Sequence, residues 1–299
     1  MTQRRRMIFA GGIASVLLAG TLASGGAAAG TSITIADKGF SESALISQLY
    51  AKALAANGFN VTVKSLGSSA IADAAVRKGD IDLYPEYTET AYVAILKRKR
   101  GAPPAKVAAA IKAAYAKRGL TTFAAAPFNN DNEVACTQAA VKKYKLSTLS
   151  SLAKVADKIT YSANPEHLTR ADGLPLLATA YGIDFKGHLK VVDISLRYRP
   201  IQQKKADCVY AFGTDPLKKK LGLVTLRDDK NLFNGYYQSF PVANSAYVAS
   251  APANLGAILN KVTASLTGND AIDLLTKIDI DKEDPADVAS AFLKSKGLI

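Results

Sequence analysis

Short strand-like and helix-like segments alternate at the start of this chain, and this alternation restricts the fold more than any other feature. Residues 32–36 alternate as a strand, and residues 41–54 repeat apolar side chains at helical spacing. A second strand is predicted at 59–63, a second helix at 70–78 and a third strand at 81–84. This order of strand, helix, strand, helix and strand predicts an α/β fold whose sheet is parallel-rich, with right-handed crossovers.

The third strand leads into the most informative stretch of the chain, residues 80–90, DIDLYPEYTET. Gly79 is expected to end the preceding helix. Pro85 is expected to end the strand, because proline cannot donate to the next bond of a sheet. The following tyrosine, glutamates and threonines are therefore expected on a loop at the carboxyl end of a strand, where open α/β sheets usually bind ligands. A surface turn with packed tyrosines is the alternative.

The length of the chain suits two lobes better than one. Residues 121–138 change from extended to turn-like and back, which indicates a crossing into a second lobe. We expect one lobe from residues 30–125 and 227–299 and another from residues 126–226. Two lobes joined by a hinge of two crossing strands form a clamshell, and the cleft between lobes is the default binding site.

The first 29 residues have the pattern of a signal peptide: three arginines at 4–6, an apolar run at 7–22 and small residues for cleavage at 27–29. The alternative, an uncleaved anchor, is disfavoured by the short run and its glycines. We therefore expect an exported protein, either periplasmic or associated with a cell surface. No lipid-attachment cysteine follows the apolar run, and the choice between general and twin-arginine export stays open.

An exported chain meets oxidising conditions, in which its two cysteines are free to pair. Cys136 and Cys208 both lie in strand-like runs, so either a disulfide or two separate buried thiols is compatible with the sequence. Two cysteines and two well-separated histidines make a structural zinc site an unattractive interpretation, and no metal or cofactor is expected.

The chain is basic, with a formal net charge of +13, and removal of the three leader arginines leaves +10. Binding to nucleic acid would require basic residues in a stripe or a known binding motif. The lysines are instead dispersed along helix-like segments, apart from three at 218–220. The charge therefore indicates a solvated basic face, and nucleic acid is not an expected partner.

Four motifs fall in one order along the chain: DKGFSE at 37–42, GDIDLYPEYTET at 79–90, LTRADGLP at 168–175 and AFGTD at 211–215. Their order and gaps resemble the substrate-binding proteins of quaternary-ammonium ABC importers, the glycine betaine, choline and carnitine receptors (the OpuAC-like family). The resemblance implies a type II periplasmic-binding-protein fold with a small zwitterion between the lobes. It also implies a monomer that delivers this ligand to an ABC permease with its ATPase.

The resemblance implies a cage of aromatic rings around the trimethylammonium group and a positively charged site for the carboxylate. Aromatic faces suit a quaternary ammonium because it has no N–H to donate. An arginine fork and an amine suit a carboxylate. The residues that fall on the family's ligand-binding positions are Lys38, Tyr87, Thr90, Asn130, Asn132, Arg170, Phe212 and Tyr236.

Two positions depart from the family pattern. Asn132 stands where a cage tyrosine is usual, and Phe212 lacks the usual hydroxyl. The cage is therefore expected to be thinner, which suits a weaker betaine site or a larger ligand such as carnitine or an ergothioneine-like betaine. A register shifted by one residue would instead bring Glu133 towards the cation.

Two other functions are alternatives to a transport receptor. An exported enzyme on the same fold would require a nucleophile and a base, and His167 near Ser162 or Thr169 is the closest arrangement in the sequence. No nucleophile elbow is present, so the chain is not expected to be an enzyme. A receptor for a different zwitterion or an amino-acid-like solute is the remaining alternative to a quaternary-ammonium receptor.

Overall fold

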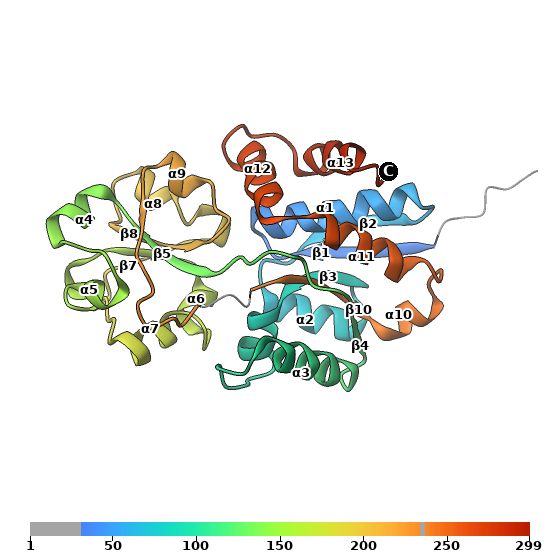
Figure 1. Ribbon diagram of the computed structural model, residues 1–299, viewed down its shortest axis with the longest axis horizontal. Coiled ribbons are helices and arrows are strands. Elements are labelled where there is room, and N and C mark those ends of the chain that lie inside the picture. Colours follow the sequence, from blue (N-terminus) through green and yellow to red (C-terminus); the bar gives the residue numbers. More distant parts are fainter. Residues whose placement is uncertain (1–30, 234–236) are drawn as a thin grey trace, which may run out of the picture.

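The computed structural model describes residues 31–233 and 237–299, in which two five-stranded sheets form the centres of two lobes (Figure 1). The expected signal peptide lies outside the described residues. Each sheet combines two parallel pairings with two antiparallel ones. The antiparallel pairings involve β10 and β5, the strands next to the crossings between the lobes. The predicted two-lobed α/β fold is confirmed.

The first sheet contains the strand–helix–strand–helix–strand unit predicted from the sequence, with β1 pairing in parallel with β2 and β3. Its strands, in spatial order, are β2 (Asn60–Ser65), β1 (Ser32–Asp37), β3 (Leu83–Tyr87), β10 (Ser239–Asn244) and β4 (Leu120–Thr122). The helices of this lobe are α1 (Ser41–Ala56), α2 (Ser69–Lys78), the π-helix η1 (Thr90–Ile95), α3 (Pro104–Ala116), α10 (Ser245–Ser250), α11 (Leu255–Ser265), α12 (Gly268–Asp279) and α13 (Pro285–Ser295).

Helix α2 shows how local sequence sets the ends of these elements. The side chain of Ser68 accepts a hydrogen bond from the backbone N–H of Ile71 at 3.2 Å, which satisfies one of the free donors of the first turn. Gly79 adopts a left-handed conformation with φ of 81°, as expected of a glycine that terminates a helix. Strand β3 therefore starts from a fixed point and runs directly towards the space between the lobes.

The expectation that Pro85 ends this strand is wrong, because β3 continues through Pro85 to Tyr87. Pro85 lies opposite Pro241 of antiparallel β10. The carbonyl of Pro241 accepts from the N–H of Phe123 at 3.1 Å and so faces away from β3. The two prolines thus occupy a position of the ladder where no hydrogen bond joins β3 to β10. Their missing N–H groups therefore cost this pairing nothing.

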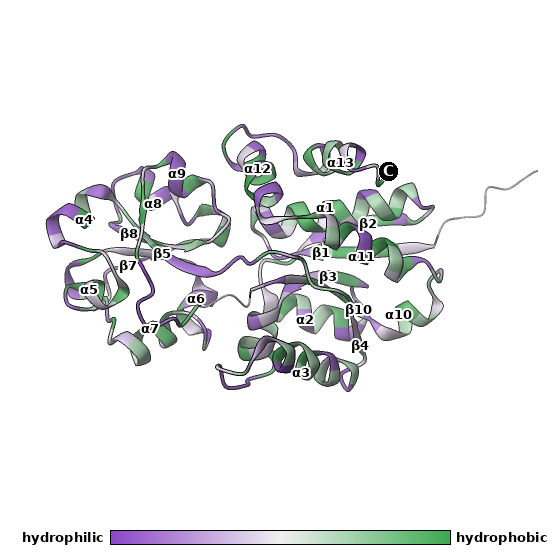
Figure 2. Ribbon diagram, in the orientation of Figure 1, coloured by the Kyte–Doolittle hydropathy of each residue, from purple (hydrophilic) through white to green (hydrophobic). Residues whose placement is uncertain are grey.

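Helix α1 lies on the first sheet and is covered on its other side by the C-terminal helices (Figure 1). Its buried Leu45, Leu49 and Leu54 belong to one apolar core with Leu259 of α11 and Leu293 of α13. Figure 2 shows this segregation, with hydrophobic colouring along α1 and hydrophilic colouring on outward surfaces such as α9 (Leu217–Lys220). The rigid core fixes the ends of β1 and β3 that approach the second lobe.

The second sheet has the spatial order β7 (Leu189–Val191), β6 (Tyr161–Ala163), β8 (Cys208–Phe212), β5 (Asn132–Cys136) and β9 (Val224–Thr225). Besides α9, its helices are α4 (Gln138–Tyr144), α5 (Leu149–Ala153), η2 (Ala156–Lys158), α6 (Pro165–Thr169), α7 (Leu174–Tyr181), η3 (Ile194–Leu196) and α8 (Arg199–Gln202). The start of α6 suits a helix, because Pro165 occupies the first turn, where a proline is tolerated.

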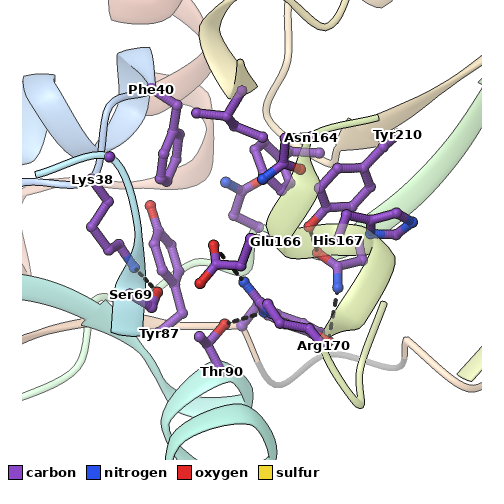
Figure 3. Close-up of a pocket in the computed structure, with 16 residues that line it drawn as sticks. Lys38, Phe40, Ser69, Tyr87, Thr90, Asn164, Glu166, His167, Arg170 and Tyr210 are labelled. Atoms are coloured by element: carbon purple, nitrogen blue, oxygen red, sulfur yellow. Dashed lines mark hydrogen bonds and ion pairs between the residues drawn. The ribbon is translucent and has the colours of Figure 1, made fainter. Parts of the chain in front are cut away.

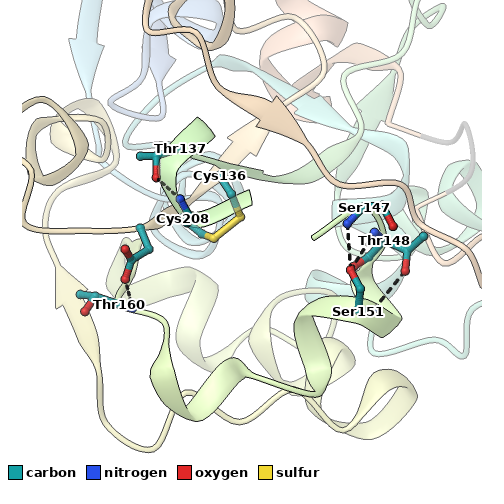
Figure 4. Close-up of a disulfide and its surroundings, with 9 residues drawn as sticks. Cys136, Thr137, Ser147, Thr148, Ser151, Thr160 and Cys208 are labelled. Carbon is teal, nitrogen blue, oxygen red and sulfur yellow. Dashed lines mark hydrogen bonds between the residues drawn. A yellow bond between two sulfur atoms is a disulfide. The ribbon is translucent and has the colours of Figure 1, made fainter. Parts of the chain in front are cut away.

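A disulfide joins the two central strands of this second lobe (Figure 4). Cys136 and Cys208 lie directly opposite each other in the antiparallel pair of β5 and β8. They therefore form a pair, rather than two separate thiols. The cross-link fixes the register of the two strands whose other ends enter the cleft.

The chain crosses between the lobes twice, and the two crossing segments are hydrogen-bonded to each other. The N–H of Ala126 donates to the carbonyl of Ser239 at 2.7 Å, and the N–H of Asn130 donates to Tyr237 at 3.0 Å. Such paired strands are suited to act as a hinge. The lobe boundaries at residues 125–126 and 226–227 stay a prediction, although all strands fall on the expected sides of them. No helix within the two described ranges is both long and apolar enough to span a bilayer.

Candidate ligand-binding site

A cavity between the lobes brings together most of the residues singled out in the sequence (Figure 3). Seven of the eight predicted site residues line it: Lys38, Tyr87, Thr90, Asn130, Asn132, Arg170 and Phe212. The eighth, Tyr236, lies outside the described residues, and its neighbour Tyr237 lines the cavity. The four motifs of the sequence therefore converge on one site from both lobes.

On the first-lobe side, the end of β1 and the end of β3 bring a buried ion pair to the cavity. The Lys38 Nζ atom lies 2.6 Å from Oε1 of Glu86 and donates to Ser69 Oγ at 3.3 Å. It also lies 4.4 Å from the centre of the Tyr87 ring. Burial lowers the pKa of Lys38, and the neighbouring Glu86 carboxylate opposes that shift. The Tyr87 face is thus already in contact with a cation.

Glu42, at the start of α1, joins this side of the cavity to the other lobe. Its carboxylate accepts from the Tyr87 hydroxyl at 2.5 Å, from Nδ2 of Asn130 at 2.8 Å and from the Thr214 hydroxyl at 2.5 Å. Burial raises the pKa of Glu42, and the three donors oppose the shift. Because Thr214 follows β8 of the second lobe, this one carboxylate connects both lobes and the crossing segment.

On the second-lobe side, Arg170 is held by a buried carboxylate two residues away. Its Nε donates to Asp172 Oδ1 at 2.8 Å and its Nη2 to Oδ2 at 2.5 Å. The same Nη2 donates to Thr90 of the first lobe at 3.0 Å. Burial alone would lower the pKa of Arg170, but Asp172 raises it well above its usual range. The guanidinium therefore stays charged, and its Nη1 atom lies 3.6 Å from Oε2 of Glu166.

The corner between α6 and α7 that carries Arg170 depends on a close backbone approach. A Cβ atom built on Gly173 would lie 2.2 Å from the carbonyl oxygen of His167. Real side chains do not approach a backbone oxygen so closely, so this position needs a glycine. The glycine of the LTRADGLP motif thus has a physical role in setting where Arg170 points.

The aromatic part of the cavity is built mainly by β8 and α6. The Tyr210 ring stacks on His167 with 3.8 Å between centroids and meets Phe212 edge-on at 4.9 Å. Phe40 of the first lobe lies 5.3 Å from Phe212. Burial, with a smaller contribution from Arg170, lowers the pKa of His167 to about 3, so its imidazole is neutral at neutral pH. It serves as an uncharged platform behind Tyr210.

Asn132 has a different place from the one that its sequence position suggested. Its Oδ1 accepts from the Tyr210 hydroxyl at 2.7 Å, and its Nδ2 donates to the Tyr237 hydroxyl at 3.0 Å. The amide thus supports two rings, although it supplies none itself. The expectation of a missing π face took no account of Tyr210 and Tyr237. Tyr210 was detectable, because it lies two residues before Phe212 and so on the same face of β8.

The shifted register that would bring Glu133 towards a ligand is not present. Asn132 pairs with Phe212 and Glu133 with Ala211, which turns Glu133 to the opposite face of the sheet. There it forms an ion pair with Lys218. The sequence analysis also missed several residues that line the cavity: Phe40, Gly67, Ser69, Asn164, Glu166, His167, Ile194, Tyr210 and Tyr237.

The arrangement suggested for an enzyme is also absent around His167. Its Nε2 shares a hydrogen bond of 3.1 Å with the Tyr161 hydroxyl. The Ser162 hydroxyl donates instead to the carbonyl of Arg197, and the Thr169 hydroxyl donates to Glu166. No group of three or more His, Cys, Asp or Glu side chains in residues 31–233 and 237–299 is placed to hold a metal ion. The site is therefore one of aromatic faces, an arginine and hydroxyls.

Two lobes joined by paired crossings, with a polar and aromatic cavity between them, define a two-lobed solute-binding protein of the type II periplasmic class. The family model "Substrate binding domain of ABC-type glycine betaine transport system" (OpuAC) matches residues 31–295. The chain belongs to this family. The resemblance noted in the sequence is thereby confirmed.

The comparisons agree on the family and differ in the ligand that each relative's name gives. The ergothioneine transport permease/ergothioneine binding protein EgtU of Helicobacter pylori is 33% identical over 226 residues, which cover 75% of this chain and 40% of that protein. The glycine-betaine-binding protein of Pseudomonas aeruginosa is 25% identical over 94% of this chain and 93% of its own length. A solved glycine betaine/carnitine/choline ABC transporter structure has a TM-score of 0.67 and 27% identity, covering 89% of this chain and 99% of that one.

Proposed function

We propose that this chain is an extracytoplasmic receptor that binds a quaternary-ammonium zwitterion between its lobes and delivers it to an ABC permease driven by an ATPase. In this proposal it acts as a monomer and without catalysis. One observation carries the proposal: five aromatic side chains and the Arg170–Thr90 pair line the same cavity, namely Phe40, Tyr87, Tyr210, Phe212 and Tyr237 with the two polar groups. The names of the relatives support the same class of ligand.

The two kinds of group suit the two ends of such a ligand. A trimethylammonium group has no N–H to donate, so aromatic faces stabilise it, with roughly 0.5–2 kcal/mol per ring. At the other end, Nη1 of Arg170 takes no part in the bonds to Asp172 and Thr90 and lies 3.6 Å from Glu166. The Thr90 hydroxyl accepts from Arg170, so it can donate its own proton to a ligand. Both groups would bind a carboxylate.

Binding in this position would couple the ligand to lobe closure. Thr90 and Tyr87 belong to the first lobe, whereas Arg170 and Tyr210 belong to the second. A ligand that contacts all four binds the closed form better than the open form and so shifts the equilibrium towards closure. The closed form is then the state that a permease would recognise.

The test is a thermal-shift screen of residues 30–299 against glycine betaine, proline betaine, choline, carnitine, ergothioneine and plain amino acids, followed by calorimetry. A ligand that binds only the folded state raises the melting temperature. We expect a quaternary-ammonium hit whose affinity falls at least tenfold in Tyr87→Ala and Arg170→Ala.

Two control variants have the same side-chain truncations away from the cavity. Tyr144→Ala lies on α4 and Arg199→Ala is exposed on α8, and both should keep wild-type affinity. A shift with amino acids but with no quaternary ammonium would contradict the proposal and favour a receptor for another zwitterion.

A further inference from the structure

Glu42 is a buried carboxylate whose hydrogen-bond donors are all uncharged. It is 2% exposed, and it accepts from the Tyr87 hydroxyl, the Asn130 amide and the Thr214 hydroxyl. A buried charge without a counter-charge is costly. Most other buried carboxylates of the described residues have a cationic partner, as in the pairs Lys38–Glu86, Arg100–Glu89, Arg170–Asp172 and Arg197–Asp215.

Glu42 lies directly behind one wall of the ligand cavity. Tyr87 lines the cavity, and its hydroxyl donates to Glu42 Oε1 at 2.5 Å, a length typical of a hydrogen bond to a charged acceptor. Glu42 itself is not among the described residues that line the cavity. A hydrogen bond from a phenol to a carboxylate shifts electron density into the ring, so the face of Tyr87 attracts a cation more strongly.

The other charges near this wall already have partners of opposite sign. Lys38 Nζ lies 4.4 Å from the centre of the Tyr87 ring, but it also lies 2.6 Å from Glu86, which offsets its charge. Figure 3 shows the Tyr87 ring between Lys38 and Glu166. Glu166 in turn lies 3.6 Å from the guanidinium of Arg170. The negative charge of Glu42 is therefore available to a cation held against Tyr87.

We propose that Glu42 is the counter-charge for the ammonium group of the ligand, acting from outside the cavity through the hydroxyl of Tyr87. This role rests on the proposed receptor function, and it names the residue that makes this wall prefer a cation to an uncharged group of the same shape. The buried surroundings strengthen an interaction that solvent would screen. Burial raises the pKa of Glu42, and an ammonium beside the ring would favour its charged form.

Pairs of ligands with equal shape and different charge test this role. The compound 3,3-dimethylbutanoate has a carbon in place of the nitrogen of glycine betaine, and 5,5-dimethylhexanoate stands in the same relation to γ-butyrobetaine. Calorimetry on residues 30–299, with displacement titrations for weak ligands, gives the ratio of affinities within each pair. We expect Glu42→Gln to lower this ratio at least tenfold, because only the charged ligand loses affinity.

Glutamine fits the hydrogen bonds that Glu42 makes. Its Oε1 can accept from Tyr87 and Asn130 as the carboxylate does. Its amide can donate to the Thr214 hydroxyl, which then donates to Asn130 Oδ1, at 2.9 Å. The substitution therefore removes the charge and leaves the contacts between the two lobes in place.

Three control variants separate charge from structure. Thr214→Val removes one donor to Glu42 and a contact between the lobes, so it should weaken both members of a pair equally and leave the ratio unchanged. Glu283→Gln, at an exposed carboxylate before α13, makes the same charge change far from the cavity and should change neither affinity. A ratio that falls in Glu166→Gln and not in Glu42→Gln would assign the counter-charge to Glu166 and overturn the proposal.

The route through the hydroxyl has its own test in Tyr87→Phe, which keeps the ring. We expect Glu42→Gln to weaken glycine betaine binding at least tenfold in the wild type and less than threefold in the Tyr87→Phe background. Equal losses in both backgrounds would overturn this route. If Glu42→Gln does not fold, Tyr87→Phe alone should lower the affinity ratio at least threefold, and an unchanged ratio would overturn the proposal.

The outcomes distinguish this role from the receptor function. Ratios that Glu42→Gln leaves unchanged would overturn the counter-charge while the receptor function stands. Absence of binding by every quaternary ammonium would overturn both. Circular dichroism of each variant checks that a change in affinity does not come from unfolding.

Discussion

The two sides of the cavity each present a buried ion pair, but the two cations differ in what they retain for a ligand. On the first-lobe side, Lys38 is a single ammonium against Glu86, and burial lowers its pKa. On the second-lobe side, Arg170 is fixed by Asp172 through Nε and Nη2 and keeps its charge, and its Nη1 lies beside Glu166 at 3.6 Å. The difference shows why an arginine suits a carboxylate site: its fork can be anchored and still bind.

Removal of the arginine should have the largest effect. Arg170→Ala leaves Asp172, which has an accessibility of 0%, as an unpaired buried charge. Loss of one partner of a buried ion pair costs about 3–5 kcal/mol. We expect urea unfolding to show a loss of this size, together with loss of ligand binding. The double variant with Asp172→Asn should recover much of the stability but not the binding, and unchanged stability in Arg170→Ala would contradict the account.

Removal of the disulfide should affect the second lobe and leave the first lobe unchanged. Cys136 and Cys208 close a loop with a sequence separation of 72 residues, for which the chain-entropy model gives about 4 kcal/mol. We expect the variant in which both cysteines are replaced by alanine to lose up to this amount of unfolding free energy, measured with urea. Hydrogen exchange should then show reduced protection in β5 and β8 and unchanged protection in β1. Equal loss of protection in both lobes would mean that they unfold as one unit.

Asn132 tests whether the second-lobe side depends on its amide as well as its rings. Asn132→Ala leaves the Tyr210 and Tyr237 hydroxyls without this partner, and a buried polar group without its partner costs about 1–3 kcal/mol. We expect a loss in this range and about tenfold weaker binding by calorimetry. Asn129→Ala, an exposed asparagine three residues earlier, should change neither measurement.

The smallest expected effect is a pH dependence from Glu42, which joins the two sides. Its folded pKa is raised, so the folded state binds the proton more tightly than the unfolded chain. Its contribution to stability is therefore full below the unfolded pKa of about 4.5 and is lost as the pH rises through the folded pKa. Glu42→Gln should remove this loss.

The measurement for Glu42 is urea unfolding of both proteins from pH 4 to pH 8. The stability of Glu42→Gln relative to the wild type should increase as the pH rises. A difference that stays constant over this range would show that the carboxylate is not the titrating group. Thr214→Val, which removes one donor to the same carboxylate, should enlarge the pH dependence.

Much of the fold follows from local sequence, because the first three strands and two helices are signalled by periodicity and by a terminating glycine. The position of Pro85 within β3 was not predictable in this way. It depends on β10, which pairs with β3 from about 150 residues further along the chain. The local sequence shows that Pro85 has no N–H. It does not show that β10 pairs with β3 in a way that makes this N–H unnecessary.

The candidate site also has a part that the sequence predicts and a part that it does not. Tyr87, Thr90 and Arg170 were identifiable because they lie within motifs, and the structure brings them together. The role of Asn132 was not, because it consists of hydrogen bonds to Tyr210 and Tyr237, which are far away in the sequence. Residue type alone indicated a missing ring, whereas the tertiary contacts make the amide a support for two rings.

The facing pair of Pro85 and Pro241 has a further consequence for how the site is assembled. If β10 slipped by one residue along β3, every side chain of that strand would turn to the other face of the sheet. A slip would also move a proline to a position where the ladder requires a donor that proline lacks. The two prolines therefore penalise misaligned pairings that a strand of other residues would tolerate. Tyr87 follows Pro85 by two residues, so the alignment that makes the hinge also fixes which face of this ring meets the ligand.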